Sequence, residues 1–265
     1  MVIVMNAYIF GLLSVVSATL LAVGGMLLVR KRVGVDALSS YHEVAGYLLS
    51  VVGTLYAVLL GFVVVDAMEH TQELRVLVDQ EASGLCNIYL CSDGLPSTKK
   101  VKIKSLCNQY ADAVINDEWQ AMQTGKYSVT AFKTVWSIWK EITNYAPETE
   151  SEKTLHQQLV NEICTMTQNR RTRIVSASHG VNPIMWTVLI VGAIFTVMFT
   201  YFFGVRNLRA QILMTVLVAM TLALNVLLVF IFGNPFSGEF AIQPDSFKLD
   251  RMIFENFDKG IPPTP

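Results

Sequence analysis

The charged residues with the most regular spacing are three carboxylates in the first third of the chain. Asp66, Glu69 and Glu73 recur every three or four residues, so a helix would place them on one face. In a symmetric oligomer such a face would form stacked acidic rings, which favour cations over anions. Two other readings are open: the carboxylates face water, or they pair with a later basic cluster, Arg170, Arg171 and Arg173.

The remaining reactive residue types lack the spacing that catalysis or metal binding requires. The 4 histidines and 4 cysteines form no CxxC pair and no HExxH motif. Neither a glycine-rich phosphate loop nor a GxSxG motif occurs. We therefore expect no catalytic, cofactor or metal site, and we expect that the protein is not an enzyme. The net charge of −1 leaves no basic surface for a nucleic acid.

The composition is typical of an integral membrane protein. Hydrophobic residues make up 52% of the chain and charged residues 15%, with a mean hydropathy of +0.45, whereas soluble domains carry about 25% charged residues. Uncharged runs long enough to cross a hydrocarbon core of about 30 Å predict four membrane helices. They lie near 6–29, 44–66, 184–204 and 211–232. Residues 30–43 are expected to be a short polar loop.

The second of these runs is predicted to be part of a much longer helix. From Glu43 to Cys91 no proline interrupts the chain, and beyond Asp66 apolar residues recur at helical spacing. We expect one continuous helix that crosses the membrane and projects roughly 40 Å beyond it.

Small residues line one face of the spanning part of this helix: Gly46, Ser50, Gly53, Ala57 and Gly61. Small residues let two helix backbones approach closely in lipid. Three readings compete: close packing inside the subunit, a contact face between identical subunits, and a pore wall.

Between the second and third membrane helices the pattern predicts a helical insert. Helices are expected near 98–123, 129–145 and 150–178, and no strand alternation is persuasive. The inward set of the first is Val101, Leu106, Tyr110, Val114, Ile115 and Trp119. The predicted fold class is all-α, with four transmembrane helices and this extramembranous insert. The predicted domains are 1–66 (membrane helices one and two), 67–182 (insert), 183–233 (membrane helices three and four) and 234–265 (extramembranous C-terminal tail).

Helix arithmetic predicts a contact within the insert. Acids beyond Asp66 and arginines before Pro183 fall at common heights of about 10–22 Å from the membrane, at 1.5 Å per residue. The acids are Glu73, Asp79 and Glu81, and the arginines are Arg170, Arg171 and Arg173. We expect antiparallel packing and at least one bond between these sets, because arginine can hold a carboxylate with two hydrogen bonds. Alternatively, the arginines meet lipid headgroups or solvent.

Several blocks of sequence resemble a known family. In order they read GTLYAVLLGFVVVDAME, EASGLCNIY, YADAVINDEWQAM, RRTRI, NPIMWTVLIVGAIFTVMFTYFFG and PFSGEF. Together, over about residues 46–247, they resemble the bacterial bestrophin-like membrane proteins. Bestrophins are oligomeric anion channels with four membrane helices, the second of which lines the pore, and a helical region inserted between the second and third. The resemblance implies that layout here. The acidic face of Asp66, Glu69 and Glu73 argues against carrying over anion selectivity.

Two features bear on the orientation in the membrane. The short loops carry basic residues, which the positive-inside rule places in the cytoplasm, leaving the insert and both termini outside. These residues are Arg30, Lys31, Arg32, Arg206 and Arg209. The arginines before the third membrane helix, and the layout of bestrophins, argue for the reverse. The cysteines, Cys86, Cys91, Cys107 and Cys164, all lie in the insert, where they would form disulfides in an oxidising compartment or remain free.

Together these patterns predict a multi-pass protein of a bacterial plasma (inner) membrane. The first hypothesis is a homo-oligomeric ion channel with the second membrane helix near the axis. Its partners would be the lipid bilayer, further copies of the chain and inorganic ions. The alternative is a membrane-anchored interaction or sensing module that conducts nothing.

Overall fold

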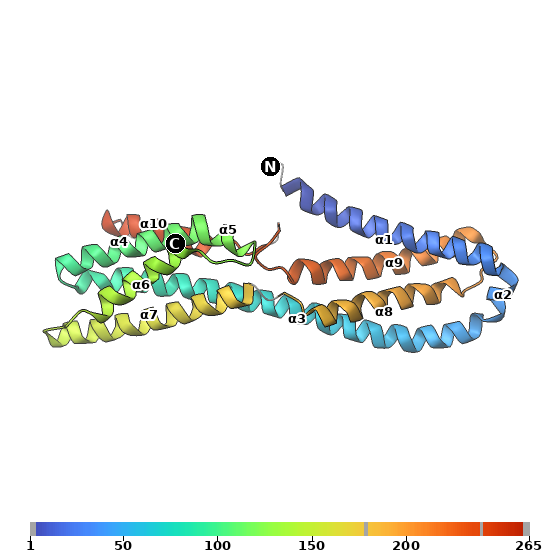
Figure 1. The fold of residues 1–265 in the computed structure, drawn as a ribbon, viewed down its shortest axis with the longest axis horizontal. Helices are drawn as coiled ribbons and strands as arrows, with labels where there is room; N and C mark the ends of the chain where they lie inside the picture. The colour runs from blue at the N-terminus through green and yellow to red at the C-terminus, as the bar shows by residue number, and fades with distance from the viewer. Residues whose placement is uncertain (1–3, 178–179, 239–240, 262–265) are drawn as a thin grey trace. The chain divides into compact units, whose positions relative to one another are not determined.

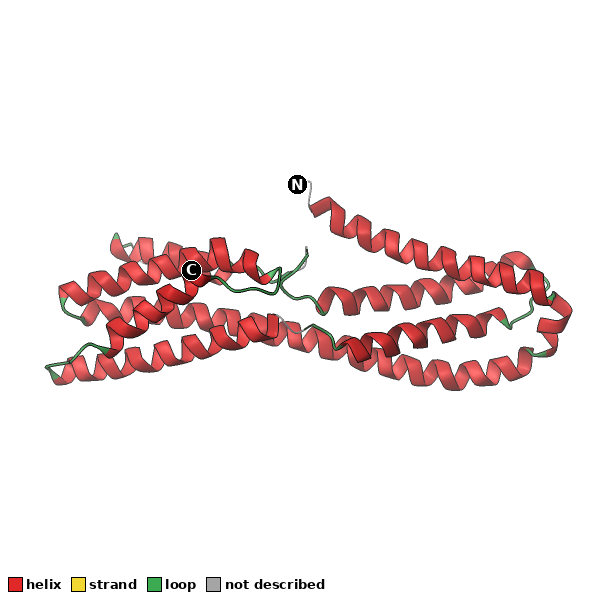
Figure 2. Ribbon diagram, in the orientation of Figure 1, coloured by secondary structure: helices red, strands yellow, loops and turns green. Residues whose placement is uncertain are grey.

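A computed structural model describes residues 4–177, 180–238 and 241–261, and within these residues the only regular secondary structure is helical (Figure 2). Figure 1 labels the helices in chain order. Their bounds are α1 Val4–Val33, α2 Val35–Ser40, α3 His42–Cys91, η1 Ser92–Gly94, α4 Ser97–Ala113, η2 Val114–Glu118, α5 Trp119–Met122, α6 Val129–Thr143, α7 Glu150–Ala177, α8 Pro183–Tyr201, α9 Leu208–Phe232 and α10 Asp245–Asp258.

The chain forms two compact units, and α3 contributes to both. The first unit is built from α1, α2, α3 as far as Thr71, α8 and α9. The second contains the rest of α3, the helices η1 to α7, and α10. Within the described residues, four helices have the length and composition to cross a membrane: Ile9–Val33, His42–Gly94, Pro183–Tyr201 and Leu208–Phe232. The protein is therefore all-α, with four transmembrane helices and a helical insert, as predicted.

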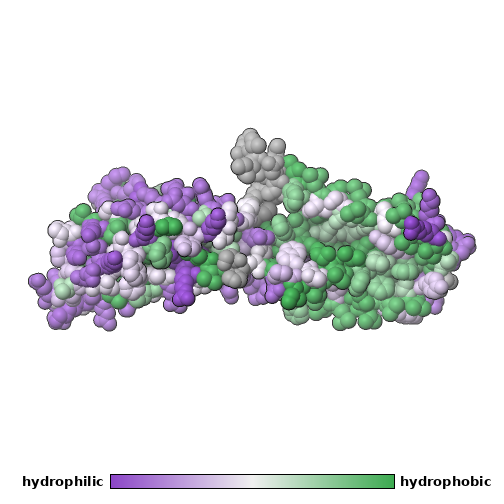
Figure 3. Space-filling view, in the orientation of Figure 1, coloured by the Kyte–Doolittle hydropathy of each residue, from purple (hydrophilic) through white to green (hydrophobic). Residues whose placement is uncertain are grey.

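The first unit has an apolar outer surface over α1, α8 and α9 (Figure 3). Inside it, α3 packs against α8 where the Tyr56 ring lies against Gly192, and the Tyr56 hydroxyl donates to the Leu189 carbonyl at 2.9 Å. Asn182 and Asn207 cap the N-termini of α8 and α9 with their side chains. Such caps satisfy amide groups that have no partner within the helix.

The second unit is organised around the later part of α3. Leu74, Val78, Leu85 and Ile88 on this helix are each at most 1% exposed and form the centre of its core. The prediction of a single helix from the membrane span to Cys91 is confirmed, since α3 ends at that residue. Gly84 is tolerated because Met166 of α7 packs directly over it, with its Cβ 3.2 Å from where a Cβ at position 84 would lie.

Three details differ from the sequence-based expectations. The predicted loop at 30–43 is mostly helical, because α1 continues to Val33 and α2 follows after Gly34, whose φ of 83° breaks the helix. Val101, predicted to point inward, is 66% exposed. Lys104 takes the place of Val101 on the inward face of α4. Its ammonium group forms ion pairs with Asp93 and Asp258 at 3.1 and 3.0 Å.

The third difference is α10, which the glycine and proline content of the tail concealed. Phe247 and Phe254 of this helix are at most 1% exposed. The Phe254 ring stacks on Tyr89 of α3 with ring centres 3.9 Å apart. The tail therefore supplies part of the core of the second unit.

Candidate functional site

The spanning part of α3 has one side turned to its own unit and the other side free. Tyr56, Leu60 and Val63 are at most 7% exposed. The opposite side carries large apolar residues that touch little within the chain: Tyr47, Val51, Leu55, Val58, Phe62 and Val65, each at least 50% exposed. A membrane helix with so wide a free sector meets either lipid or another protein surface.

The predicted small-residue face lies at the edge of this free sector. Ser50, Ala57 and Gly61 are exposed, and a Cβ at Gly61 would meet nothing within 4 Å. A Cβ at Gly53 would meet only Leu49 of the same helix, at 3.7 Å. At Gly46 the one neighbour is Phe203, at 3.8 Å. Close packing inside the subunit therefore does not account for these residues, and the two readings that involve other copies or a pore stay open.

The predicted acidic face is also free. Asp66, Glu69 and Glu73 are exposed, and none has an ion pair or side-chain hydrogen bond with another described residue. At 3.6 residues per turn, however, their mean direction lies about 150° around the helix from that of the small residues. The acidic and small residues therefore form two separate lines on α3, and a single axis can face only one of them.

A second group of predicted residues forms a buried ion-pair cluster within the second unit. Arg173 of α7 donates to Glu81 of α3 from Nε at 2.7 Å and from Nη2 at 2.8 Å. The same Nη2 donates to Glu118 at 2.7 Å. Arg170 donates to the other oxygen of Glu118 at 2.5 Å. Tyr110 donates its hydroxyl to Glu81 at 2.6 Å.

This cluster confirms the expected pairing between the arginines and the acids of α3, through Arg173 and Glu81. Asp79 accepts a hydrogen bond from Ser246 at 2.5 Å instead. Arg171 is exposed and has no ion pair among the described residues. Sequence reasoning missed Glu118, although its position supplied a signal: it is an acid between two inward-facing residues, Val114 and Trp119, in a helical stretch.

The charges of the cluster balance and hold each other. Burial by itself would lower the pKa of the Arg173 guanidinium, but the carboxylates of Glu81 and Glu118 raise it above its ordinary value. Burial raises the pKa of the Tyr110 hydroxyl, and the charge of Glu81 raises it further. Two arginines thus face two carboxylates, so the cluster is suited to fixing α3, η2 and α7 together.

One buried carboxyl in the second unit has no such compensation. Asp250 of α10 is 5% exposed and its Oδ2 accepts no hydrogen bond from a described residue. Burial raises its pKa to about 8. Burial and the charge of Asp250 also raise the pKa of the Cys86 thiol to about 11.

All of the cysteines in the described chain are free, so the disulfide reading has no support in this structure. Among the described residues, no three or more histidine, cysteine, aspartate or glutamate side chains lie close enough together to hold a metal ion.

Comparison with known proteins agrees with this architecture. The sequence profile of a Bestrophin-like domain matches residues 16–247. No curated protein matches the chain. A variant of a bacterial Bestrophin homolog from Klebsiella pneumoniae has a TM-score of 0.68 at 13% identity, covering 91% of this chain and 98% of that chain.

Two further crystal structures give the same result. The Klebsiella pneumoniae homolog solved by Zn-SAD phasing has a TM-score of 0.65 at 13% identity, covering 94% of this chain and 99% of that chain. A variant of a membrane protein has a TM-score of 0.68 at 12% identity, covering 92% and 97%. At such identities the likeness is one of fold.

Proposed function

The chain belongs to the bestrophin-like family, and from that premise we propose that it is a homo-oligomeric ion channel of a bacterial plasma membrane with α3 near the axis. The observation that supports this proposal is the free sector of α3. A helix long enough to span the bilayer leaves large side chains such as Leu55 and Phe62 68% and 72% exposed. Further copies of the chain would cover that sector.

The directions of the side chains around α3 suggest how the copies meet. The direction opposite to the buried side falls between the small line and a bulky line that includes Leu55 and Phe62. In a ring of subunits, the small line of one α3 would receive the bulky line of the next, as close-packed membrane helices do. The residues left facing the axis are Tyr47, Thr54, Val58 and Val65. This arrangement gives a mainly apolar pore wall within the membrane.

Ion flux through liposomes that contain the purified protein tests the proposal. Wild-type protein should release a trapped salt gradient, and Val58→Trp should reduce that flux at least tenfold, because the larger side chain narrows the axis in every subunit. Leu20→Trp is the matched control, since Leu20 is a lipid-facing residue of α1 that is 66% exposed. Equal flux in Val58→Trp and Leu20→Trp would contradict the axial position of Val58.

The alternative is a membrane-anchored interaction module that conducts nothing. The subunit count of the detergent-solubilised protein separates the two functions. Three or more copies around a closed axis, together with flux, support the channel. A monomer or dimer without flux supports the module, in which case the insert would be the part that binds a partner.

The orientation is a separate question that one cysteine can decide. The positive-inside rule predicts that the insert lies outside the cytoplasm, whereas the layout of bestrophins predicts the reverse. Arg170 and Arg173 are buried and paired with carboxylates, so they count less as positive charges that would mark the cytoplasmic side. Cys164 is exposed on α7, so a membrane-impermeant maleimide will label it in intact cells under the first orientation. Labelling only after lysis would establish the second, and Cys164→Ser is the control.

A further inference from the structure

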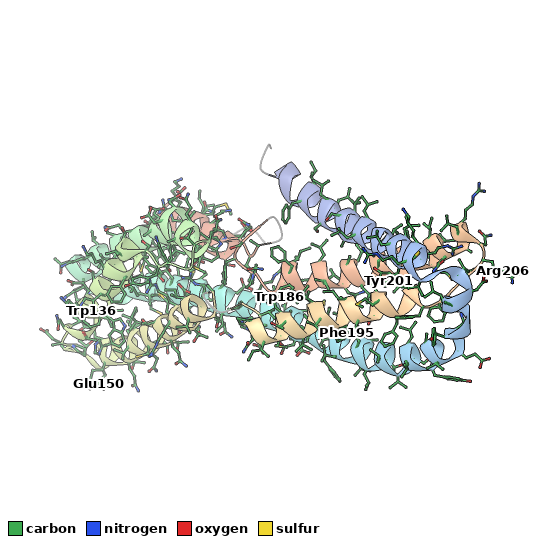
Figure 4. All side chains as sticks on the ribbon, turned by 45° about the vertical axis from the view of Figure 1, so that its right-hand side comes forward. Trp136, Glu150, Trp186, Phe195, Tyr201 and Arg206 are labelled. Carbon is green, nitrogen blue, oxygen red and sulfur yellow. The ribbon has the colours of Figure 1, made fainter. Side chains whose placement is uncertain are left out.

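An apolar groove runs along the membrane helices α1, α8 and α9 and involves no residue of α3. Its volume is about 530 Å³, within the range of sites that hold small molecules. On α8 it extends from Trp186 to Tyr201 (both labelled in Figure 4), which is about 22 Å at 1.5 Å per residue. A groove of this length covers most of a hydrocarbon core of about 30 Å.

The lining of the groove matches a hydrocarbon chain. Several of its lining residues are alanines, among them Ala18 and Ala22 of α1 and Ala193 of α8. The hydroxyl of Ser14 is already used, since it donates to the Gly11 carbonyl at 2.7 Å. Between Trp186 at one end and Tyr201 at the other, the lining therefore offers almost no free hydrogen-bonding group, as expected for a surface that holds an acyl chain.

One end of the groove has polar character. The Tyr201 ring lies against α1 at Gly25, with its hydroxyl oxygen 2.8 Å from the position that a Cβ at residue 25 would take. That hydroxyl has no hydrogen bond with any described residue. Arg30 follows on α1 about 7.5 Å further along, and it donates to the Val205 carbonyl at 2.7 Å and to the Arg206 carbonyl at 3.1 Å.

Several cations at this end have no partner in the part of the chain that the structure describes. The exposed side chains of Lys31, Arg32, Arg206 and Arg209 make no ion pair or hydrogen bond with a described residue. Arg206 extends away from the helices in Figure 4. Basic residues at the membrane surface attract anionic lipid headgroups. An apolar groove about one acyl chain long thus ends below a set of unpaired cations.

We propose that this groove is a binding site for an anionic phospholipid, with one acyl chain between α1, α8 and α9 and the phosphate at the cations beyond Tyr201. The lipid would fill the space that the contacts of α1 with α8 and α9 leave open, and would add contacts among these three helices. The site uses no residue of the free sector of α3, so the proposal does not rest on the channel function proposed above.

Quenching of tryptophan fluorescence by brominated lipids tests the proposal directly. Trp186 lines the groove, whereas Trp119, Trp136 and Trp139 belong to the second unit. The full chain is placed in phosphatidylcholine vesicles that contain increasing amounts of brominated phosphatidylglycerol or brominated phosphatidylcholine. The signal of Trp186 is the difference between wild type and Trp186→Phe. We expect its quenching to saturate at a low fraction of phosphatidylglycerol and to rise in proportion to brominated phosphatidylcholine.

Two pairs of variants separate the acyl-chain site from the headgroup site. Ala18→Phe fills the groove and should abolish the saturable quenching, whereas Val16→Phe should not, because Val16 is exposed on α1 outside the groove. Replacing Lys31, Arg32, Arg206 and Arg209 by Gln should weaken the phosphatidylglycerol preference about fivefold for each cation removed. The control replaces four lysines that are exposed in the second unit, Lys126, Lys133, Lys140 and Lys259, by Gln. It removes the same amount of charge and should leave the phosphatidylglycerol preference unchanged.

Three outcomes would overturn the proposal. Quenching that rises in proportion to both brominated lipids would mean contact with bulk lipid only. No quenching of Trp186 by either lipid would mean that protein, such as a second copy of the chain, covers the groove. Saturable quenching that persists in Ala18→Phe would place the lipid elsewhere.

Discussion

Arg173 and Glu81 form a two-point ion pair with both side chains 0% exposed. Nε and Nη2 of the guanidinium donate to the two carboxylate oxygens at 2.7 and 2.8 Å. The pair joins α7 to α3 across 92 residues of sequence. Desolvating two ions is costly, so such a pair adds little stability compared with an apolar contact. Breaking it is different, since one charge is then left buried without a partner.

The first prediction follows from that asymmetry. Glu81→Gln should lower the free energy of unfolding by about 3–5 kcal/mol, because Arg173 keeps its charge and loses half of its compensation. Unfolding in urea followed by tryptophan fluorescence measures the change. Glu150→Gln removes a carboxylate of the same type from an exposed pair with Lys153 and should leave the stability nearly unchanged. Equal midpoints for the two variants would contradict a structural role of the buried pair.

The pair of Arg173 and Glu81 could be predicted from the sequence, whereas the part played by Glu118 was missed. The common height of Arg173 and Glu81 follows from the helix rise alone, because no breaker interrupts α3 before Cys91. For Glu118 the sequence offers only its position between inward-facing residues, because η2 is a π-helical turn that shifts the direction of the residues after Ala113.

Two other outcomes have similar physical explanations. The helix α10 was missed because glycine and proline surround it, although its apolar residues, among them the buried Phe247 and Phe254, recur at helical spacing. The second outcome is the separation of the small and acidic residues of α3 into two lines. Small and acidic residues each repeat at helical spacing, but nothing in either repeat reveals the angle between them until both are placed on one helix.

The second prediction concerns pH. The pKa of Asp250 is raised to about 8 in the folded protein, whereas an aspartate in an unfolded chain titrates near 4. Between these values the folded state holds a proton that the unfolded state lacks, so stability falls as the pH rises. The slope reaches about 1.4 kcal/mol per pH unit and vanishes above the folded-state pKa. Urea unfolding at a series of pH values from 5 to 8 measures it.

Variants of α10 assign that slope to Asp250. Asp250→Asn cannot ionise and should flatten the profile between pH 5 and 8. Asp245→Asn should keep the wild-type slope, since Asp245 is exposed and paired with Lys248. The thiols of Cys86 and Cys107 have raised pKa values and stay neutral over this range. The nearby charges are compensated, with Asp112 bonded to Arg251 and Lys104 to Asp258. An unchanged slope in Asp250→Asn would mean that another group titrates.

The third prediction tests the contact between α3 and α8 in the membrane unit. A Cβ at Gly192 would lie 2.3 Å from a ring carbon of Tyr56, whose hydroxyl is fixed by the Leu189 carbonyl. Gly192→Ala should therefore cost about 1–3 kcal/mol through overpacking. The readout is the temperature at which the detergent-solubilised protein loses its monodisperse peak in size-exclusion chromatography. Gly24→Ala, where a Cβ would meet nothing within 4 Å, should be neutral or stabilising. Similar losses in both variants would show that any added methyl group in this unit is harmful.

The last prediction addresses the acidic line at the end of the membrane span. If copies of α3 surround an axis opposite to their buried sides, Glu69 is the carboxylate directed nearest to that axis, and Asp66 and Glu73 point more toward the neighbouring subunit. A ring of carboxylates attracts cations and repels anions. Glu69→Gln should therefore lower the cation-to-anion permeability ratio about fivefold, corresponding to about 1 kcal/mol for one charge interacting through water. Asp66→Asn should change the ratio in the same direction by less. The reversal potential across a planar bilayer with a salt gradient measures both, and Glu150→Gln on the exposed surface of α7 is the control. A larger effect of Asp66→Asn than of Glu69→Gln would mean that Asp66, not Glu69, points toward the axis. An unchanged permeability ratio in both variants would mean that the acidic residues do not line the ion path.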